Sequence, residues 1–319
     1  MDRIPLIAIV LAAAFVRGVS GDEPAAPDSA WLRRLIRSQE AVDWSDTRVG
    51  HDWRLQSRPR DGRCRILDPH DAVVRQGSAA ECHAAYAALE ADGTIPPPAG
   101  AAVIVLHGLG EGRASMRPIA DHLRGTLDAT VLLVGYASTA ATIEEHGRSL
   151  DAVISGLPAS TRLSFVGHSL GNLVVRRWMS LAGDAALARV DRMVMLGPPN
   201  QGSELARHVG GVGILAALAA GAARDLVIEW RQVEPQLAVP QCEFGIVAGG
   251  RGDDLGFSPL LDGDDDAVVR VAETKLDGAN DFLLVPVHHA AMLRDQRVKR
   301  ATESFLKAGR FAADGEADR

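Results

Sequence analysis

Apolar runs alternate with helix-like segments over most of the chain. Each run is short and rich in Val, Ile and Leu, and none alternates with polar residues, which is typical of strands buried on both faces. The runs are AAVIVLHG (101–108), ATVLLVGY (129–136), RLSFVG (162–167), DRMVMLG (191–197), FGIVAGG (244–250) and DFLLVPV (281–287). Helical spacing follows or separates them in 116–127, 143–157, 172–183 and 290–309. This order predicts an α/β fold with a mostly parallel central sheet and helices on both faces.

The chain before residue 100 has a different pattern. A helical face built on Trp31, Leu32, Leu35 and Ile36 precedes two extended runs that meet at Asp61-Gly62, a dipeptide typical of a hairpin turn. Ser78 and Glu81 have the spacing of a capping box that opens a helix ending at Gly93. We expect residues 22–99 to complete the sheet, with the hairpin as its first two antiparallel strands, before a stiff Pro-rich break.

One segment of the catalytic region, residues 100–311, interrupts the alternation. Residues 203–240 form a small insertion after the sixth strand, counting the hairpin as two, and their centre is the small, apolar GGVGILAALAAGAARDL. Two interpretations are open: a mobile lid over a pocket, or a buried helix packed closely through Gly and Ala.

Composition narrows the class of protein. The chain has 319 residues, of which 47% are apolar, so it can fill a sizeable core. Its net charge is −7, and its 34 Lys and Arg residues are scattered rather than gathered in a stripe. Neither property favours a nucleic acid as partner.

The first residues have the layout of a secretory signal. Arg3 precedes an apolar stretch, Ile4 to Val16, and small residues lead to Gly21, where we expect cleavage. Residues 1–21 therefore predict export, to the periplasm or the medium; an uncleaved interfacial anchor is the alternative. Export would permit a disulfide, for which Cys64 and Cys82 are the local pair; three unlinked thiols are the alternative, and no cysteine spacing suits a metal.

A serine lies between two glycines where a strand is expected to become a helix. The stretch is Gly167-His168-Ser169-Leu170-Gly171, and the G-x-S-x-G pattern gains weight from the strand before it and the helix after it. A tight turn of this kind projects a serine hydroxyl towards a base, and glycines allow the backbone to approach closely. Ser169 is the candidate nucleophile; an ordinary helix N-cap is the alternative.

Acyl chemistry also needs backbone N–H donors for the developing oxyanion. The helix that begins at Leu170 offers one donor at its positive end. The second candidate is Leu109, in the Gly-rich loop HGLGEG after an earlier buried strand; a plain turn is the alternative interpretation of that loop.

A base and an acid follow the serine in the chain. His288 and His289 end the last strand, where at most one of them can face Ser169 because neighbouring side chains point opposite ways. Four carboxylates follow the seventh strand in LDGDDDAVV: Asp262, Asp264, Asp265 and Asp266. One of these carboxylates would orient the imidazole of the catalytic histidine. The run also looks like the start of a calcium loop, but it lacks the closing glutamate.

Together these pieces resemble the α/β-hydrolase superfamily and, within it, the bacterial lipase and esterase branch. The matching pieces occur in the order of that branch between residues 103 and 311: VIVLHGLG, FVGHSLGNLVVR, MLGPPNQGS, DDAVV followed by AET, and VPVHHAAML with a terminal helix ending in FLKAGRF. The resemblance implies Asp266 as the acid, in an Asp-Gly-x-Val-like pattern where Ala267 replaces the glycine, with Asp264 as a reserve. It implies His289 as the base, with His288 where a small polar residue is common.

The sequence thus predicts an exported serine hydrolase with a Ser169-His289-Asp266 triad that cleaves carboxylic esters through an acyl-enzyme, without a cofactor or metal. We expect a small-molecule or lipid ester as substrate, with transient contact to a lipid interface. An acyltransferase, thioesterase or amidase would use the same triad. A hydrolase-like protein that has lost catalysis and only binds its ligand is the alternative from another class.

Overall fold

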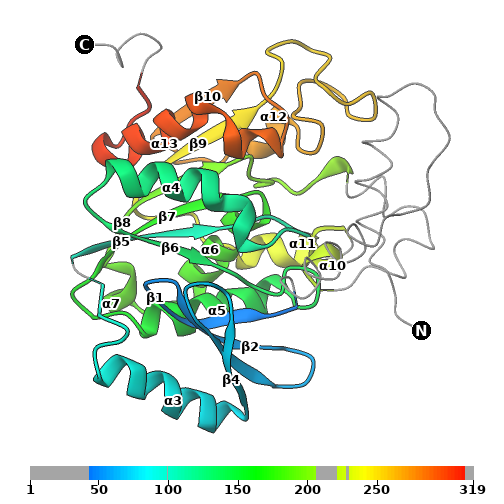
Figure 1. Ribbon diagram of the computed structural model, residues 1–319. Helices are drawn as coiled ribbons and strands as arrows, with labels where there is room; N and C mark the ends of the chain where they lie inside the picture. Colours follow the sequence, from blue (N-terminus) through cyan, green and yellow to red (C-terminus); the bar gives the residue numbers. More distant parts are fainter. Residues whose placement is uncertain (1–42, 99, 206–220, 228–229, 313–319) are drawn as a thin grey trace, which may run out of the picture.

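The computed structural model describes residues 43–98, 100–205, 221–227 and 230–312. Its centre is a six-stranded sheet in which every neighbouring pair is parallel, in the order β10-β9-β8-β7-β5-β6 (Figure 1). The strands are β5 (Ala101–Leu106), β6 (Thr130–Val134), β7 (Arg162–His168), β8 (Val190–Leu196), β9 (Glu243–Gly249) and β10 (Asp281–Val285). The prediction of a mostly parallel α/β sheet is confirmed.

Both faces of the sheet are covered, which explains the unbroken apolar runs. Along β5, Ile104 and Leu106 face one core with α5 (Ile143–Ser155) and α6 (Leu170–Leu181), whereas Val103 and Val105 face the other. On that other face lie α4 (Arg117–Thr126) and α13 (Gln296–Ala308) (Figure 1). Alternate residues of one strand are therefore buried in two different cores, so no polar alternation is visible in the sequence.

The strand order reverses between β5 and β7. The chain passes from β5 outward to β6 and then back across β5 to β7, after which it continues to β8, β9 and β10. Leu106 at the end of β5 pairs with Gly167 of β7, so the loops that follow these two strands leave the sheet side by side. A ligand crevice is expected at such a switch point, outside the carboxyl ends of the strands.

The N-terminal strands do not complete this sheet, so our expectation for residues 22–99 was wrong. They form a separate antiparallel sheet of β1 (Ser45–Gly50), β2 (Trp53–Ser57), β3 (Cys64–Leu67) and β4 (Val73–Gly77) (Figure 1). The hairpin itself is confirmed, because Ser57 pairs with Cys64 across the turn that contains Gly62 at φ 67°.

Buried polar side chains explain why this sheet stays separate. The Asp46 carboxylate accepts hydrogen bonds from Gly135 N–H at 2.7 Å and Arg54 Nη1 at 2.7 Å, and Arg54 also donates to the Leu133 carbonyl at the end of β6. Asp46 and Arg54 are almost completely buried. Side chains thus bind the backbone at the end of β6. Asp46 N–H also donates to the Gly135 carbonyl at 2.9 Å, but no strand ladder joins the two sheets in the described residues.

The capped helix α3 (Ala79–Ala91) covers this small sheet. Ser78 and Glu81 form the predicted capping box. Cys82 and Tyr86 of α3 pack on Leu55 and Cys64 in a core of their own. Cys64, Cys82 and Cys242 are free thiols, so the Cys64–Cys82 disulfide is not formed. The two thiols serve as small apolar groups in this core.

The terminal helix differs from its prediction. Residues 290–309 split into η3 (Ala291–Arg294) and α13, because Asp295 stands between them and its side chain accepts a hydrogen bond from Arg297 N–H as N-cap of α13. The remaining short elements are η1 (Arg113–Met116), α7 (Asp184–Leu187), α10 (Ala222–Val227), α11 (Trp230–Val233), η2 (Glu234–Gln236) and α12 (Val271–Thr274).

The insertion at 203–240 follows β8, which is the fourth strand of the parallel sheet rather than the sixth, because the hairpin belongs to the other sheet. Ala222, Leu226 and Trp230 are buried in the core beside α6. The predicted leader 1–21, the helical face at 31–36 and the centre of the insertion, 206–220, lie outside the described residues. No helix in the described part of the chain is long and apolar enough to span a bilayer.

Candidate active site

Ser169 occupies a strained turn between β7 and α6. Its backbone has φ 51° and ψ −120°, a conformation that L-residues rarely adopt and that proteins keep mainly at functional sites. The glycines around it are needed for close approach. A Cβ on Gly167 would lie 2.8 Å from the backbone nitrogen of Asn172, and one on Gly171 would lie 2.7 Å from the Leu106 carbonyl oxygen. The predicted role of both glycines is confirmed.

We expect Gly171→Ala to destabilise the protein by about 1–3 kcal/mol and to reduce activity, because the new methyl group meets backbone atoms of Leu106 and His107 at the end of β5 rather than a movable side chain. Urea unfolding would measure the loss of stability. Gly183→Ala is the matched control, since an added Cβ there meets no atom within 4 Å. Equal stability of the two variants would contradict the packing argument.

The two candidate oxyanion donors flank the serine. Leu170 N–H is at the first position of α6, and Gly108, just before Leu109, lies so close to Ser169 that a Cβ there would be 3.2 Å from the serine Cβ. Within the described residues, neither Leu109 N–H nor Leu170 N–H donates to a protein acceptor. Gly108 N–H is already used, because it donates to Glu111 Oε2 at 3.0 Å. The two leucine amides are thus available to a ligand oxygen.

Asp266 and His289 form a buried hydrogen-bonded pair. His289 Nδ1 lies 2.6 Å from Asp266 Oδ2, and His289 N–H donates to the Asp266 carbonyl at 2.8 Å. The other carboxylate oxygen accepts from Val268 N–H at 3.0 Å and Val269 N–H at 2.7 Å. Asp266 is fully buried and His289 is 8% exposed. The carboxylate is therefore fixed, and it fixes the orientation of the imidazole.

The pair lies beside the serine turn. The ring of His168, the residue before Ser169, packs on the His289 ring with centroids 4.7 Å apart. Gly197, with φ 51°, fits against the pair: a Cβ there would lie 3.1 Å from the His289 ring. In the described structure Ser169 Oγ makes no hydrogen bond to His289; contacts of this kind often tighten only when substrate binds. The structure thus gathers Ser169, His289 and Asp266 at one edge of the sheet.

The alternative acid and base residues have other roles. Asp264 accepts from Arg251 N–H at 2.6 Å and Gly252 N–H at 2.9 Å, and buried Asp265 accepts from Ser258 N–H and Ala267 N–H. Asp262 is exposed. His288 stacks on Phe257, with ring centroids 4.0 Å apart, and is exposed. Asp264 and Asp265 therefore hold the backbone of the loops around Asp266. Among the described residues, no group of three or more His, Cys, Asp or Glu could hold a metal ion.

Charge sets the basicity of His289. Burial lowers the pKa of His289, but the charge of Asp266, the hydrogen bond to its carboxylate and the charge of Glu111 raise it, and the pKa ends above its ordinary value of 6.5. An imidazole in this setting is a stronger base towards a serine hydroxyl than a free one.

Comparisons with known proteins support the fold. No protein-family model matches the chain, and no curated protein gives a significant match. Among solved structures, the mature form of lipase BlEst2 from Bacillus licheniformis has a TM-score of 0.50 at 16% identity, over 68% of this chain and 94% of that one. Its propeptide form has a TM-score of 0.51 at 17% identity, over 68% of this chain and 52% of that one. The chain has the α/β-hydrolase fold.

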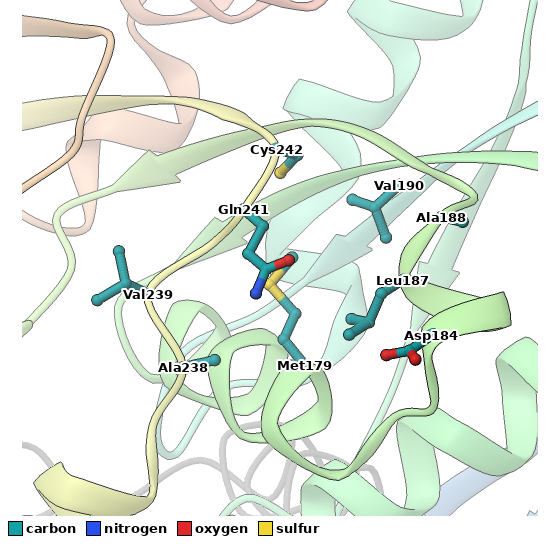
Figure 2. A pocket seen from close by; sticks show the side chains of 9 residues that line it. All are labelled: Met179, Asp184, Leu187, Ala188, Val190, Ala238, Val239, Gln241 and Cys242. Carbon is teal, nitrogen blue, oxygen red and sulfur yellow. The ribbon is translucent and has the colours of Figure 1, made fainter.

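In this fold, a pocket lies at the far end of the sheet from Ser169. The pocket is lined by side chains from α6, α7, the chain that leads into β8 and the segment before β9 (Figure 2). They are Met179, Asp184, Leu187, Ala188, Val190, Ala238, Val239, Gln241 and Cys242. Val190 begins β8 and Cys242 precedes β9, so the pocket opens at the amino ends of these strands. Ser169 and Asp266 follow carboxyl ends, and the pocket therefore does not belong to the candidate active site.

Sequence reasoning missed Glu111 and assigned no role to His168. Glu111 Oε2 receives three hydrogen-bonding groups, from Gly108, Ser115 and His168. One signal was available: an acidic residue stands in the Gly-rich loop HGLGEG, two positions after the candidate donor Leu109. What it binds could be found only from the three-dimensional structure.

Proposed function

We propose that this protein is a serine hydrolase that cleaves carboxylic esters through an acyl-enzyme intermediate. The observation that carries the proposal is the buried Asp266–His289 pair beside Ser169, which itself sits on a strained turn at the switch point of the sheet. Export is part of the proposal, on the leader-like pattern of residues 1–21.

In the acylation step, His289 Nε2 takes the proton of Ser169 as Oγ attacks the ester carbonyl carbon. Asp266 keeps the proton of His289 on Nδ1 and stabilises the imidazolium that forms. The N–H groups of Leu109 and Leu170 bind the oxyanion. Collapse of the tetrahedral intermediate expels the alcohol, which takes the proton from His289. Water, activated by the same imidazole, then releases the carboxylic acid.

Exposed leucines favour an apolar ester. Leu255 and Leu260 are 72% and 68% exposed, on the loop that runs from β9 to the acidic run before Asp266. Phe257 of the same loop packs on His288, next to the candidate base. Apolar side chains are therefore presented at the edge of the sheet where the ester would bind. Similarity in fold to a protein described as a lipase points to the same substrate class.

A fluorophosphonate probe tests the proposal directly, because only a serine activated by a base reacts with it. We expect one equivalent of label, located on Ser169 by peptide mass spectrometry. Heat-unfolded protein is the control and should not react. Folded protein that stays unlabelled would leave the hydrolase-like binding protein as the remaining interpretation.

The raised pKa of His289 predicts the pH dependence. The base works in its neutral form, so kcat/KM for an uncharged ester should be highest at alkaline pH and fall as pH drops through the pKa of His289. We expect the midpoint of this acid limb above 6.5, the ordinary value for a histidine. A profile from about pH 5 to pH 9 measures it. A midpoint below 6.5 would contradict the charge assignment.

A further inference from the structure

Glu111 joins the oxyanion loop to the nucleophile turn. One of its oxygens, Oε2, accepts from Gly108 N–H at 3.0 Å and from Ser115 Oγ at 2.9 Å, and lies 3.3 Å from His168 Nδ1. Its side chain is 25% exposed and that of His168 is 1% exposed. Burial raises the pKa of the Glu111 carboxyl. The charge and hydrogen bond of His168 and the hydrogen bond from Gly108 together have the larger, opposite effect, and the pKa lies well below its ordinary value. Glu111 is therefore ionised and accepts all three bonds.

His168 faces acceptors on both sides. Its Nδ1 meets the Glu111 carboxylate, and its Nε2 lies 3.2 Å from the backbone carbonyl oxygen of His289. A neutral imidazole has one N–H and one lone pair, so it would turn a lone pair towards an acceptor at one of these contacts. Only the imidazolium, which has two N–H donors, satisfies both. The two contacts therefore favour a doubly protonated ring at His168.

His107, in the loop that carries Glu111, contrasts with His168. Its Nδ1 lies 2.9 Å from the Gly108 carbonyl oxygen, and its Nε2 accepts from Tyr136 N–H at 3.3 Å. One acceptor and one donor suit the neutral ring with its proton on Nδ1. Complete burial lowers the pKa of His107 in agreement with this assignment. The partners of His107 thus suit a neutral ring, whereas those of His168 suit an imidazolium.

We propose that Glu111 and His168 form a charged pair that positions the catalytic groups, with Glu111 holding the oxyanion loop and the His168 imidazolium holding the carbonyl of His289. The proposal rests on the proposed function for its catalytic meaning. The pair connects three loops: the one after β5, the turn after β7 and the loop after β10. These loops carry Leu109, Ser169 and His289.

Positioning of this kind acts on the chemical step. Oxyanion donors and a general base are effective only within a fraction of an ångström of their productive places, so loosening the three loops should lower kcat more than it changes KM. The charges around His168 are Glu111 on one side and His289 with Asp266 on the other. Without Glu111, no carboxylate touches the His168 ring in the described structure, so a buried imidazolium there would lack an anionic partner.

The charge state is tested by ¹⁵N NMR of the histidine ring nitrogens in the full chain at about pH 7.5. We expect both nitrogens of His168 to be protonated in the wild type and one to be deprotonated in Glu111→Gln. The ring nitrogen signals of His168 are assigned as those that disappear in the variant His168→Gln. Glu303→Gln is the matched control, because Glu303 also pairs with a histidine: its carboxylate lies 2.8 Å from His122 Nε2, between α13 and α4. A neutral His168 in the wild type would overturn the proposal, whether or not the protein hydrolyses esters.

Kinetics test the positioning role. Glu111→Gln should lower kcat for a p-nitrophenyl ester about 10- to 100-fold with KM within about twofold, whereas Glu303→Gln should match the wild type. Wild-type kcat in Glu111→Gln would overturn the role. If Glu111→Gln fails to fold, Ser115→Ala, which removes one of the three bonds, should show a smaller fall in kcat, and no fall would overturn it. Ester turnover that survives loss of Ser169 would instead refute the proposed function.

Discussion

Substituting Ser169 by alanine is expected to abolish ester hydrolysis without unfolding the protein. In the proposed mechanism Ser169 Oγ forms the acyl bond, so its loss should lower kcat by about 10⁴- to 10⁶-fold, leaving only the rate supplied by binding and the oxyanion donors. Stability should change little. Alanine keeps the Cβ that already occupies the positive-φ turn, and Ser169 Oγ makes no hydrogen bond within the described residues.

The measurement is kcat for a p-nitrophenyl ester, with the melting temperature as a check on folding. Ser180→Ala is the matched control: it removes a hydroxyl from α6, where Ser180 Oγ hydrogen-bonds to Arg177 at the exposed surface. We expect wild-type kcat from this variant. If Ser169→Ala kept more than about one tenth of wild-type kcat, a nucleophile other than Ser169 would be at work.

The parallel sheet could be predicted because its signal is local. Every strand from β5 to β10 shows in the sequence as an apolar run, and the positions of Ser169, Asp266 and His289 relative to those runs place all three after strand ends. Loops that follow parallel strands meet at one edge, so the order of motifs was enough to gather the candidate site.

The N-terminal sheet could not be predicted, because its signal is not local. β1 (SDTRVG) contains a buried aspartate whose partners include Arg54 and Gln56 on β2 and the backbone of Gly135, 89 residues away. In the sequence such a strand looks like a polar loop. β4 is exposed along most of its length and has no apolar face that would mark it. Only the hairpin turn and the capping box, which are local patterns, were predicted correctly in this region.

The Glu111–His168 contact was invisible for the same reason. It joins residues 57 positions apart through side-chain atoms alone.

Ala267 is an intermediate case, because part of its role could be predicted from the sequence. The sequence showed that it stands where related patterns have glycine, and the structure gives the consequence, because Ala267 has φ 80°. The backbone keeps the left-handed conformation that the glycine would allow, at some cost in strain, and Asp266 stays in place.

Asp266→Asn is expected to lower kcat by about 10³- to 10⁴-fold with little change in fold. Asp266 Oδ1 accepts from the N–H groups of Val268 and Val269, so the asparagine oxygen should take that position to keep both bonds. Its NH₂ group then replaces Oδ2 and faces His289 Nδ1. Because an NH₂ group donates, Nδ1 must become the acceptor and the ring proton moves to Nε2. His289 would then present a proton, instead of a lone pair, to Ser169.

Asp264→Asn is the control that decides between the two carboxylates. Asp264 accepts from Arg251 N–H and Gly252 N–H, and it makes no hydrogen bond to His289 in the described structure. An asparagine keeps one of these bonds, so kcat should stay within a few-fold of wild type.

At high pH, hydroxide should partly replace the general base and restore part of the activity of Asp266→Asn, because the histidine of that variant holds its proton on the wrong nitrogen. The reverse result, with Asp264→Asn inactive and Asp266→Asn active, would transfer the role of the acid to Asp264.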